Sequence, residues 1–181
     1  MKMKPFVAAL AVVVSLMSFC SCEKEGVKLF DGNYSFKTSG ILTIERTAKV
    51  SESDASAGIL DFPDGNRTFR LALTSESGQM NVIKTGDNSV IVTMNVVGGD
   101  AFVFSGKAEG KVLTLDPAVR FVSFRDGANT VSLEVTVSGT AEKHDDVAVF
   151  TLEYTGGGET TLYDYKILAS EVKCVAKLNE D

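Results

Sequence analysis

Several common features are missing from this chain, and their absence narrows its function. It contains no tryptophan, one histidine and three prolines in 181 residues. Acidic side chains outnumber basic ones by 24 to 18, and no run of basic residues interrupts them, which argues against nucleic acid and against electrostatic docking on anionic lipid. No stretch keeps a sustained helical period, which excludes a helical bundle. The glycine run Gly156-Gly157-Gly158 precedes no Lys-Ser/Thr pair, so it is not a phosphate-binding loop.

The first 21 residues have the pattern of a secretory signal. Lys2 and Lys4 give a basic start, and an apolar segment of about 14 residues follows up to Phe19. That segment is shorter than the roughly 20 residues that a membrane-spanning helix needs. We therefore expect residues 1–21 to be removed, residues 22–32 to form a tether, and residues 33–181 to form one domain.

The end of this segment resembles the signal of bacterial lipoproteins, in which a cysteine behind a small residue is acylated and becomes the first residue of the mature chain. Ser21-Cys22 fits this pattern, whereas the bulky Phe19 stands before Cys20. The resemblance implies a lipid anchor on Cys22, a membrane as partner and a place in the cell envelope, at the outer membrane. Glu23-Lys24-Glu25 is similar to the acidic segments that direct some lipoproteins to the cell surface.

The mature chain would have 160 residues, from 22 to 181, which is enough for one domain with a core. Removing Lys2 and Lys4 changes its formal charge to 16 − 24 = −8. With Cys20 removed and Cys22 acylated, Cys174 is alone, so no disulfide framework can form. Cys174 alternates with Val172 and Ala176, which predicts a small buried side chain.

Period-two alternation runs along most of the remaining sequence. Thr130 to Ser138 is the clearest case, with four aliphatic residues alternating against polar ones. Turn residues separate about ten to twelve such segments at intervals of eight to twelve residues. We expect an all-β fold, an antiparallel up-and-down barrel as first choice and a two-sheet β-sandwich as second. A short helix within Lys166 to Lys177 is the remaining alternative for that segment.

Turns or loops are expected where glycine, proline or charged residues cluster. These are Thr38-Ser39-Gly40, Ser51 to Ala57, Pro63 to Asn66, Gly86-Asp87-Asn88, Gly98-Gly99-Asp100, Asp116-Pro117, Asp126-Gly127, Ala141 to Asp146 and Gly156-Gly157-Gly158.

Groups able to perform chemistry are few, so we expect no enzyme, no cofactor and no metal. His144 lies in the polar segment Glu142 to Asp146, where nothing would hold it against a nucleophile. One histidine and one free cysteine are too few for a zinc site. Asp145-Asp146, Asp61 with Asp64, and Asp87 with Asn88 could help hold calcium, but turn formation explains them as well. A pair of carboxylates across a cleft, as in glycosidases, is left open.

The strands are rich in phenylalanine, which could fill a core or line a ligand cavity. Phe36, Phe69, Phe102, Phe104, Phe121, Phe124 and Phe150 are the residues concerned. Gly32-Asn33-Tyr34 is similar to the Gly-x-Trp sequence that opens many lipocalins, and a calycin or lipocalin-like barrel would imply ligand binding without catalysis. Two functions follow: a lipid-anchored barrel that holds a small apolar or amphiphilic ligand, or an interaction module that binds an envelope protein or a glycan. The ligand-binding residues themselves stay unassigned.

Overall fold

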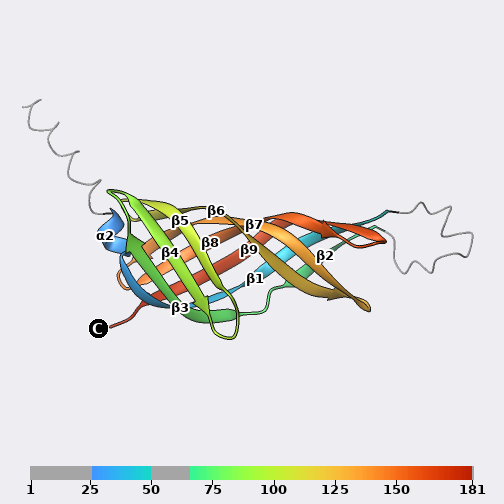
Figure 1. The fold of residues 1–181 in the computed structure, drawn as a ribbon, viewed down its shortest axis with the longest axis horizontal. Coiled ribbons are helices and arrows are strands. Elements are labelled where there is room, and N and C mark those ends of the chain that lie inside the picture. Colours follow the sequence, from blue (N-terminus) through green and yellow to red (C-terminus); the bar gives the residue numbers. More distant parts are fainter. Residues whose placement is uncertain (1–25, 50–65, 181) are drawn as a thin grey trace, which may run out of the picture.

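Long antiparallel strands dominate the computed structural model, which describes residues 26–49 and 66–180 (Figure 1). One short helix precedes them. The elements are α2 (Gly26–Phe30), β1 (Gly32–Ala48), β2 (Arg67–Ala72), β3 (Glu76–Lys84), β4 (Ser89–Val96), β5 (Ala101–Glu109), β6 (Val112–Asp126), β7 (Asn129–His144), β8 (Val147–Glu159) and β9 (Tyr163–Leu178).

The strands form one sheet that closes on itself. From β3 to β9 each strand pairs with the next along the chain, and β1 pairs with β9 to close the ring. The expected all-β antiparallel fold with an up-and-down order of strands is therefore confirmed. One strand departs from that order, because β1 pairs with β3 along its first half and with β2 along its second half.

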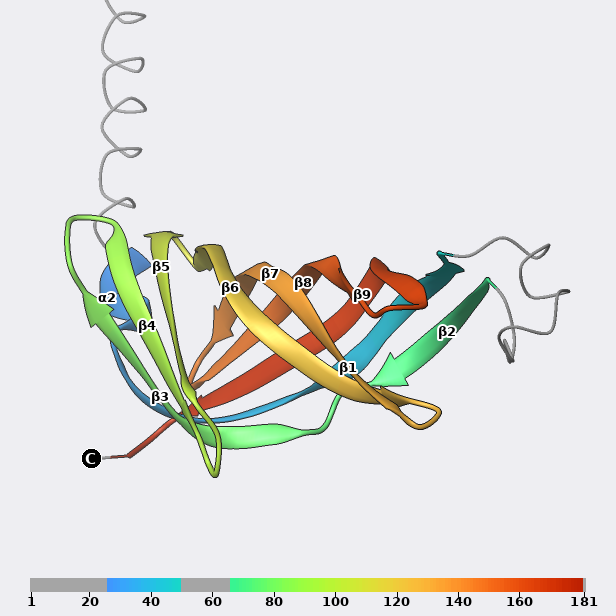
Figure 2. The ribbon, with the colours of Figure 1, turned by 45° about the vertical axis from the view of Figure 1, so that its right-hand side comes forward.

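The two ends of this ring differ in the number of strands. Near α2, every strand except β2 takes part. The β2–β3 link and the β4–β5 turn lie about halfway along, so β3, β4 and β5 do not reach the opposite end (Figure 2). Beyond Leu115, β6 has no backbone pairing with β5, and within the described residues none joins it to β2. The wall is therefore interrupted by a seam between β6 and the part of the chain that runs from β2 into the start of β3, residues 67–76, here called the β2–β3 segment.

Alternation decides which side chains face the interior. In β7 the aliphatic residues Val131, Leu133, Val135 and Val137 are all buried, as the sequence predicts. The predicted turns at Gly98-Gly99-Asp100 and at Asp126-Gly127 connect strands as expected. Gly98 and Gly127 both adopt positive φ angles there, which glycine tolerates better than other residues. The predicted loop from Ser51 to Ala57 lies outside the described residues, as does the predicted turn from Pro63 to Asn66 except for Asn66 itself.

Two of the predicted turns are wrong, because those segments lie within long strands. Thr38-Ser39-Gly40 belongs to β1, where each of the three residues is paired with β9. Gly156-Gly157-Gly158 belongs to β8. A Cβ atom on Gly157 would lie 2.1 Å from the Tyr165 carbonyl oxygen, so these glycines let backbones approach rather than turn the chain.

The predicted ends at Asp116-Pro117 and within Ala141 to Asp146 also need correction. β6 continues through Pro117 by means of an irregularity in its pairing with β7, between Leu115 and Ala118. β7 continues to His144, so that only Asp145 and Asp146 turn the chain. The alternative of a helix within Lys166 to Lys177 is wrong, because that segment lies in β9.

Helix α2 occupies part of the sequence assigned above to the tether. Val27 and Phe30 are fully buried, and Gly26 packs on the β5–β6 turn, where a Cβ atom would lie 2.9 Å from the Gly110 nitrogen. The helix therefore belongs to the domain and fills its eight-stranded end. Three residues, 23–25, are left between Cys22 and the domain.

Candidate functional site

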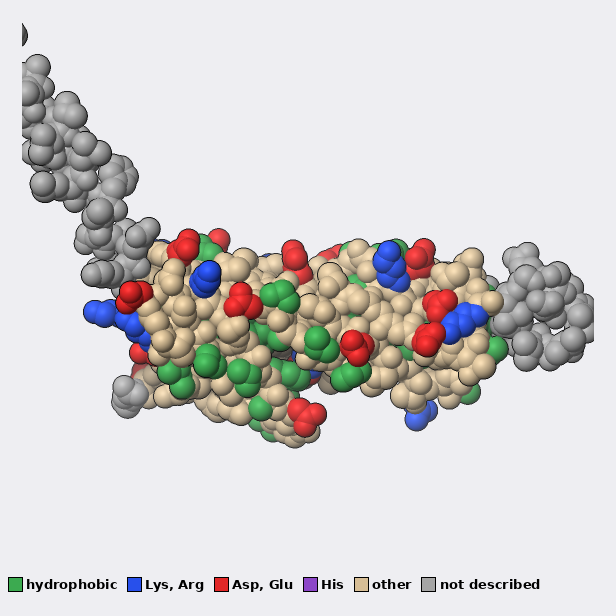
Figure 3. Space-filling model, turned by 45° about the horizontal axis from the view of Figure 1, so that its top comes forward, with side chains coloured by type: hydrophobic (Ala, Val, Ile, Leu, Met, Phe, Trp, Pro, Cys, Tyr) green, Lys and Arg blue, Asp and Glu red, His purple; other side chains and the backbone are tan. Residues whose placement is uncertain are grey.

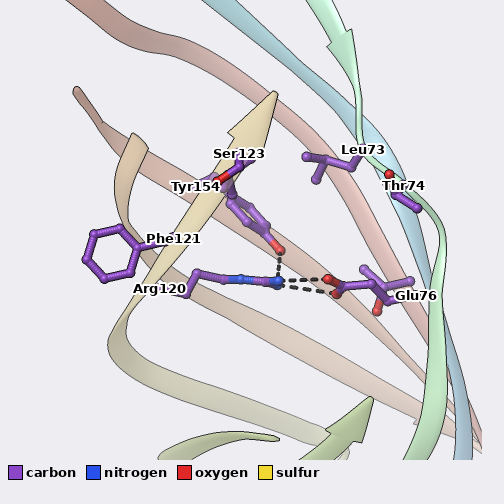
Figure 4. A pocket seen from close by; sticks show the side chains of 9 residues that line it. Leu73, Thr74, Glu76, Arg120, Phe121, Ser123 and Tyr154 are labelled. Carbon is purple, nitrogen blue, oxygen red and sulfur yellow. Dashed lines mark hydrogen bonds and ion pairs between the residues drawn. The ribbon is translucent and has the colours of Figure 1, made fainter. Parts of the chain in front are cut away.

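A recess opens in the barrel wall at the seam between β6 and the β2–β3 segment (Figure 4). Its volume is about 140 Å³. The lining residues come from four different parts of the chain, and they are Thr38, Leu73, Thr74, Glu76, Arg120, Phe121, Val122, Ser123 and Tyr154. The recess therefore exists only because strands distant in sequence meet at this point.

The irregular pairing near Pro117 orients the central residue, Arg120. Before it, Leu113 and Leu115 face the interior of the barrel. After it, the buried residues are Val122 and Phe124, so the inward phase has moved by one residue. A bulge has this effect, because one extra residue shifts the alternation of the strand. Arg120 consequently points inward with the apolar residues that follow it.

Arg120 is held by contacts on several sides. It donates two hydrogen bonds to the Glu76 carboxylate, at 2.8 and 3.4 Å, and one to the Tyr154 hydroxyl at 3.1 Å (Figure 4). Its guanidinium carbon lies 3.9 Å from the centre of the Phe102 ring, a cation–π arrangement. Burial by itself would lower the pKa of Arg120, but the bonds and charges of Glu76 and Tyr154 together outweigh it and raise the pKa above its ordinary value.

Two buried polar atoms at the recess have no nitrogen or oxygen partner. One is Nε of Arg120, and the other is the hydroxyl of Thr38, a residue that is only 4% exposed. Thr38 stands opposite Cys174 in the β1–β9 ladder and opposite Glu76 in the β1–β3 ladder, and the Glu76 carboxylate is engaged by Arg120. Buried hydroxyls normally form a hydrogen bond, and a thiol is a weak substitute. The wall of the recess thus contains two buried polar atoms without a nitrogen or oxygen partner.

The described lining does not form a catalytic arrangement. Glu76 is its one carboxylate, and Arg120 engages both of its oxygens. Hydrolysis of a glycosidic bond normally uses two carboxylates facing each other across the substrate. The hydroxyls of Thr38, Thr74 and Ser123 have no histidine among the lining residues to activate them. The arrangement is suited to holding polar groups.

A second polar cluster lies inside the end of the barrel opposite α2. This end is formed by the six strands β1, β2, β6, β7, β8 and β9. Arg46 and Asp126 form an ion pair of 3.0 Å with both side chains 5% exposed, and Arg67 contacts the same carboxylate. Tyr165 donates a hydrogen bond of 2.9 Å to Asp126. Burial would raise the pKa of Asp126, but the bonds from Arg46 and Tyr165 hold it below its ordinary value. Every oxygen of Asp126 is occupied, so this cluster ties β1, β2, β6 and β9 together.

A third cluster joins α2 to the barrel. Lys143 is 5% exposed and donates hydrogen bonds to the Leu29 carbonyl at 2.6 Å and to the Tyr34 hydroxyl at 2.9 Å. Tyr34 in turn donates to the Phe30 carbonyl at 2.7 Å. Burial lowers the pKa of Lys143 and raises that of Tyr34 to about 12. These bonds satisfy carbonyls at the end of the helix, a structural role.

Among the described residues, those considered for chemistry from the sequence are not brought together into one site. His144 is exposed at the end of β7, 3.7 Å from Glu142. Asp145 and Asp146 lie in the β7–β8 turn and Asp87 in the β3–β4 turn, whereas Asp61 and Asp64 lie outside the described residues. In the part of the chain that the structure describes, no group of three or more possible ligands surrounds a metal position.

Of the three cysteines, Cys174 is the one within the described residues. Cys174 is a free, buried thiol, as the sequence predicts, and burial raises its pKa to about 11. Cys22 and Cys20 lie outside the described residues. Among the described residues, no helix is long and apolar enough to cross a membrane.

No local pattern in the sequence marks Arg120, Glu76 or Thr38 as a site residue. Arg46 and Asp126 were detectable, because each continues an alternating apolar series in its strand, Leu42-Ile44 and Val122-Phe124 respectively. Arg120 gave no such signal, since the bulge that turns it inward moves the phase of β6. No family model and no curated protein matches this chain.

Proposed function

We propose that this protein is a lipid-anchored, non-catalytic binding module of the cell envelope, and that it binds a glycan at the recess around Arg120. Cys22 would carry the lipid and hold the domain at the outer membrane, exposed to the cell surface. The observation that carries the proposal is the recess itself, in which Thr38 Oγ1 and Arg120 Nε are buried without a nitrogen or oxygen partner.

The size of the recess favours part of a larger polar ligand. At about 140 Å³ it is smaller than the roughly 300–1,000 Å³ of pockets that enclose a drug-sized molecule. Large side chains, among them Tyr34, Phe30, Phe150 and Leu42, are fully buried in the barrel interior. This packing gives less support to an apolar ligand inside the barrel than to binding at the wall.

The chemistry of the lining favours a sugar residue. Sugar hydroxyls both donate and accept hydrogen bonds, as do the hydroxyls of Thr38, Thr74 and Ser123. Phe121 is 64% exposed and points away from Arg120 on the outer side of β6 (Figure 4). A ligand that contacts both Arg120 and Phe121 must extend beyond the recess, which favours an oligosaccharide over a single sugar. The Phe121 ring would offer an apolar face to the next sugar unit.

Glycan-array binding of the mature protein in detergent tests the proposal. Phe121→Ala should weaken binding of the selected glycan, whereas Val119→Ala, an equally exposed residue on the same strand face, should leave it unchanged. Thr38→Val should also weaken binding, by about 1–2 kcal/mol, because it removes a hydrogen-bonding hydroxyl. Equal affinities for all these variants, or no glycan bound by the unmodified protein, would refute binding at this recess.

The anchor is tested separately by metabolic labelling with a palmitate analogue. We expect Cys22→Ser to abolish incorporation and to release the protein from the membrane fraction. Cys20→Ser is the matched control and should incorporate label normally. Loss of label in Cys20→Ser but not in Cys22→Ser would show that the lipid is on Cys20 and would contradict the proposal.

The same proposal includes a lipocalin-like character of the barrel. Its support is the closed order of strands and the position of Gly32-Asn33-Tyr34, which begins β1 next to α2. Tyr34 is 1% exposed and lies under the Lys143 ammonium group, 5.1 Å from its ring centre.

A further inference from the structure

One face of the barrel wall differs from the others in carrying no charge. It is the outer face of β3, β4 and β5 between Ser77 and Ser105. The outward side chains of these strands are Ser77, Gln79, Asn81, Ile83, Ser89, Ile91, Thr93, Asn95, Ala101, Val103 and Ser105. We refer to these residues as the neutral wall. Charged residues border it: Lys107 pairs with Ser89, Glu109 follows on β5, and Asp87 and Asp100 lie in the two turns that join these strands.

The neutral wall also displays apolar side chains to solvent. Ile83 is 51% exposed, Val103 57% and Ile91 39%, and Val97 in the β4–β5 turn is 79% exposed. Figure 3 shows apolar side chains gathered toward the hairpin that β4 and β5 form. Neighbouring strands bring them together, because Ile83 pairs with Ile91 and Val103 pairs with the residue two positions beyond Ile91. A grouped apolar surface of this kind marks a contact site.

The diametrically opposite wall has a different character. Four steps round the eight-stranded ring separate β5 from β9. Most outward side chains of β9 are charged, among them Lys166, Lys173 and Lys177, and Glu153 projects from neighbouring β8. Pressing that wall against a low-dielectric surface would remove water from charged groups at a high cost in free energy.

The position of the tether suggests what covers the neutral wall. Cys22 lies four residues before Gly26, and four residues span at most about 14 Å whatever their conformation. Gly26 packs on the β5–β6 turn, so a lipid on Cys22 would enter the bilayer beside β5. A strand of nine residues such as β5 is about 30 Å long. A barrel that is tethered at this end and tilts toward the bilayer would therefore contact it along the length of one wall.

We propose that the neutral wall lies against the bilayer that holds the lipid anchor, with Ile83, Ile91 and Val103 reaching the boundary between headgroups and acyl chains. This inference rests on the proposed lipid anchor. Apolar side chains at this depth add to the binding energy of an acyl anchor. The recess opens at the seam between β6 and the β2–β3 segment, so it stays outside the neutral wall.

A pair of single-cysteine labels tests the contact in the mature, acylated protein reconstituted into phosphatidylcholine vesicles. Val103→Cys places a polarity-sensitive dye on the neutral wall, and Val175→Cys places it on β9, at a residue of similar exposure. Cys22 is blocked by acylation and Cys174 is buried, so neither competes for the label. We expect lipid-borne nitroxides to quench the dye at position 103 several-fold more strongly than at position 175.

Equal quenching at both positions in protein that floats with the vesicles would overturn the neutral-wall contact and leave the anchor intact. Protein that does not float with the vesicles would overturn the anchor as well. A dye at position 103 that becomes shielded in detergent alone, and more so at higher protein concentration, would mean that a second copy covers the wall and would also overturn the proposal.

Discussion

Asp126 shows how much depends on a single carboxylate inside this barrel. It accepts hydrogen bonds from Arg46 and Tyr165 and contacts Arg67, and it does so at 5% exposure of its side chain. Loss of the carboxylate would remove the ion pair of Arg46, whose side chain is also only 5% exposed. Breaking one partner of a buried ion pair is costly, even though the pair itself contributes little net stability.

We expect Asp126→Asn to lower the free energy of unfolding by about 3–5 kcal/mol in urea titrations. Glu171→Gln is the control, since Glu171 pairs with Arg70 at 3.1 Å on the surface, where such pairs contribute less than about 1 kcal/mol. A loss of similar size in both variants would contradict the structural role of Asp126.

The pH dependence of stability follows with a definite sign. The folded pKa of Asp126 is below its ordinary value of 3.8, so its stabilising contribution is complete above that pH and is lost as pH falls through the folded value. The unmodified protein should therefore lose stability steeply under acid conditions below about pH 4, and Asp126→Asn should show a shallower slope there.

At the scale of the elements, the glycines of β8 determine how closely three strands approach. Gly156 has a φ of 120° and Gly157 faces the backbone of β9. The pairing of β8 with β9 is irregular here, between Leu152 and Gly157. The run of glycines therefore lets β8 bend between β7 and β9 without side chains that would keep them apart.

We expect Gly157→Ala to destabilise the protein by about 1–3 kcal/mol, because the new methyl group would collide with the Tyr165 carbonyl oxygen. Gly86→Ala in the β3–β4 turn is the matched control. Its new methyl group would meet nothing closer than Ser89 Cβ at 3.4 Å, so its thermal midpoint should stay near that of the unmodified protein. Equal midpoints for both variants would show that β8 can shift to accept the added group.

At the scale of the whole molecule, the barrel has a closed half and an interrupted half. Near α2 each strand has neighbours on both sides, whereas among the described residues β2 pairs only with β1. None of the residues of β2 is fully buried. Strands with one paired edge and few buried side chains open more easily than strands inside a closed sheet.

Native-state hydrogen exchange should reveal this difference. We expect the amides of β2 to exchange faster than those of β4, with alternate residues of β2 protected, because only every second amide of a one-sided antiparallel ladder is bonded. The central amides of β4, which pairs with β3 and β5, serve as the internal reference. Uniform protection along β2 would mean that another segment covers its free edge.

The sequence by itself determined the strands, because the alternation of side chains is a local property with a period of two. It therefore predicted the β7 alternation, the turn at Gly98 and the buried Cys174. It could not tell that glycines at 156–158 extend a strand, since the same residues also make turns. That distinction depends on the neighbouring backbones.

Only the tertiary structure decided where polar side chains meet. Arg120 and Glu76 are 44 residues apart in the chain, and Arg46 and Asp126 are 80 apart. Their meeting depends on the register of several strand pairs and on the bulge near Pro117, which sets the inward phase of β6. The location of the candidate site thus follows from pairings between distant segments, and no local pattern in the amino-acid sequence encodes them.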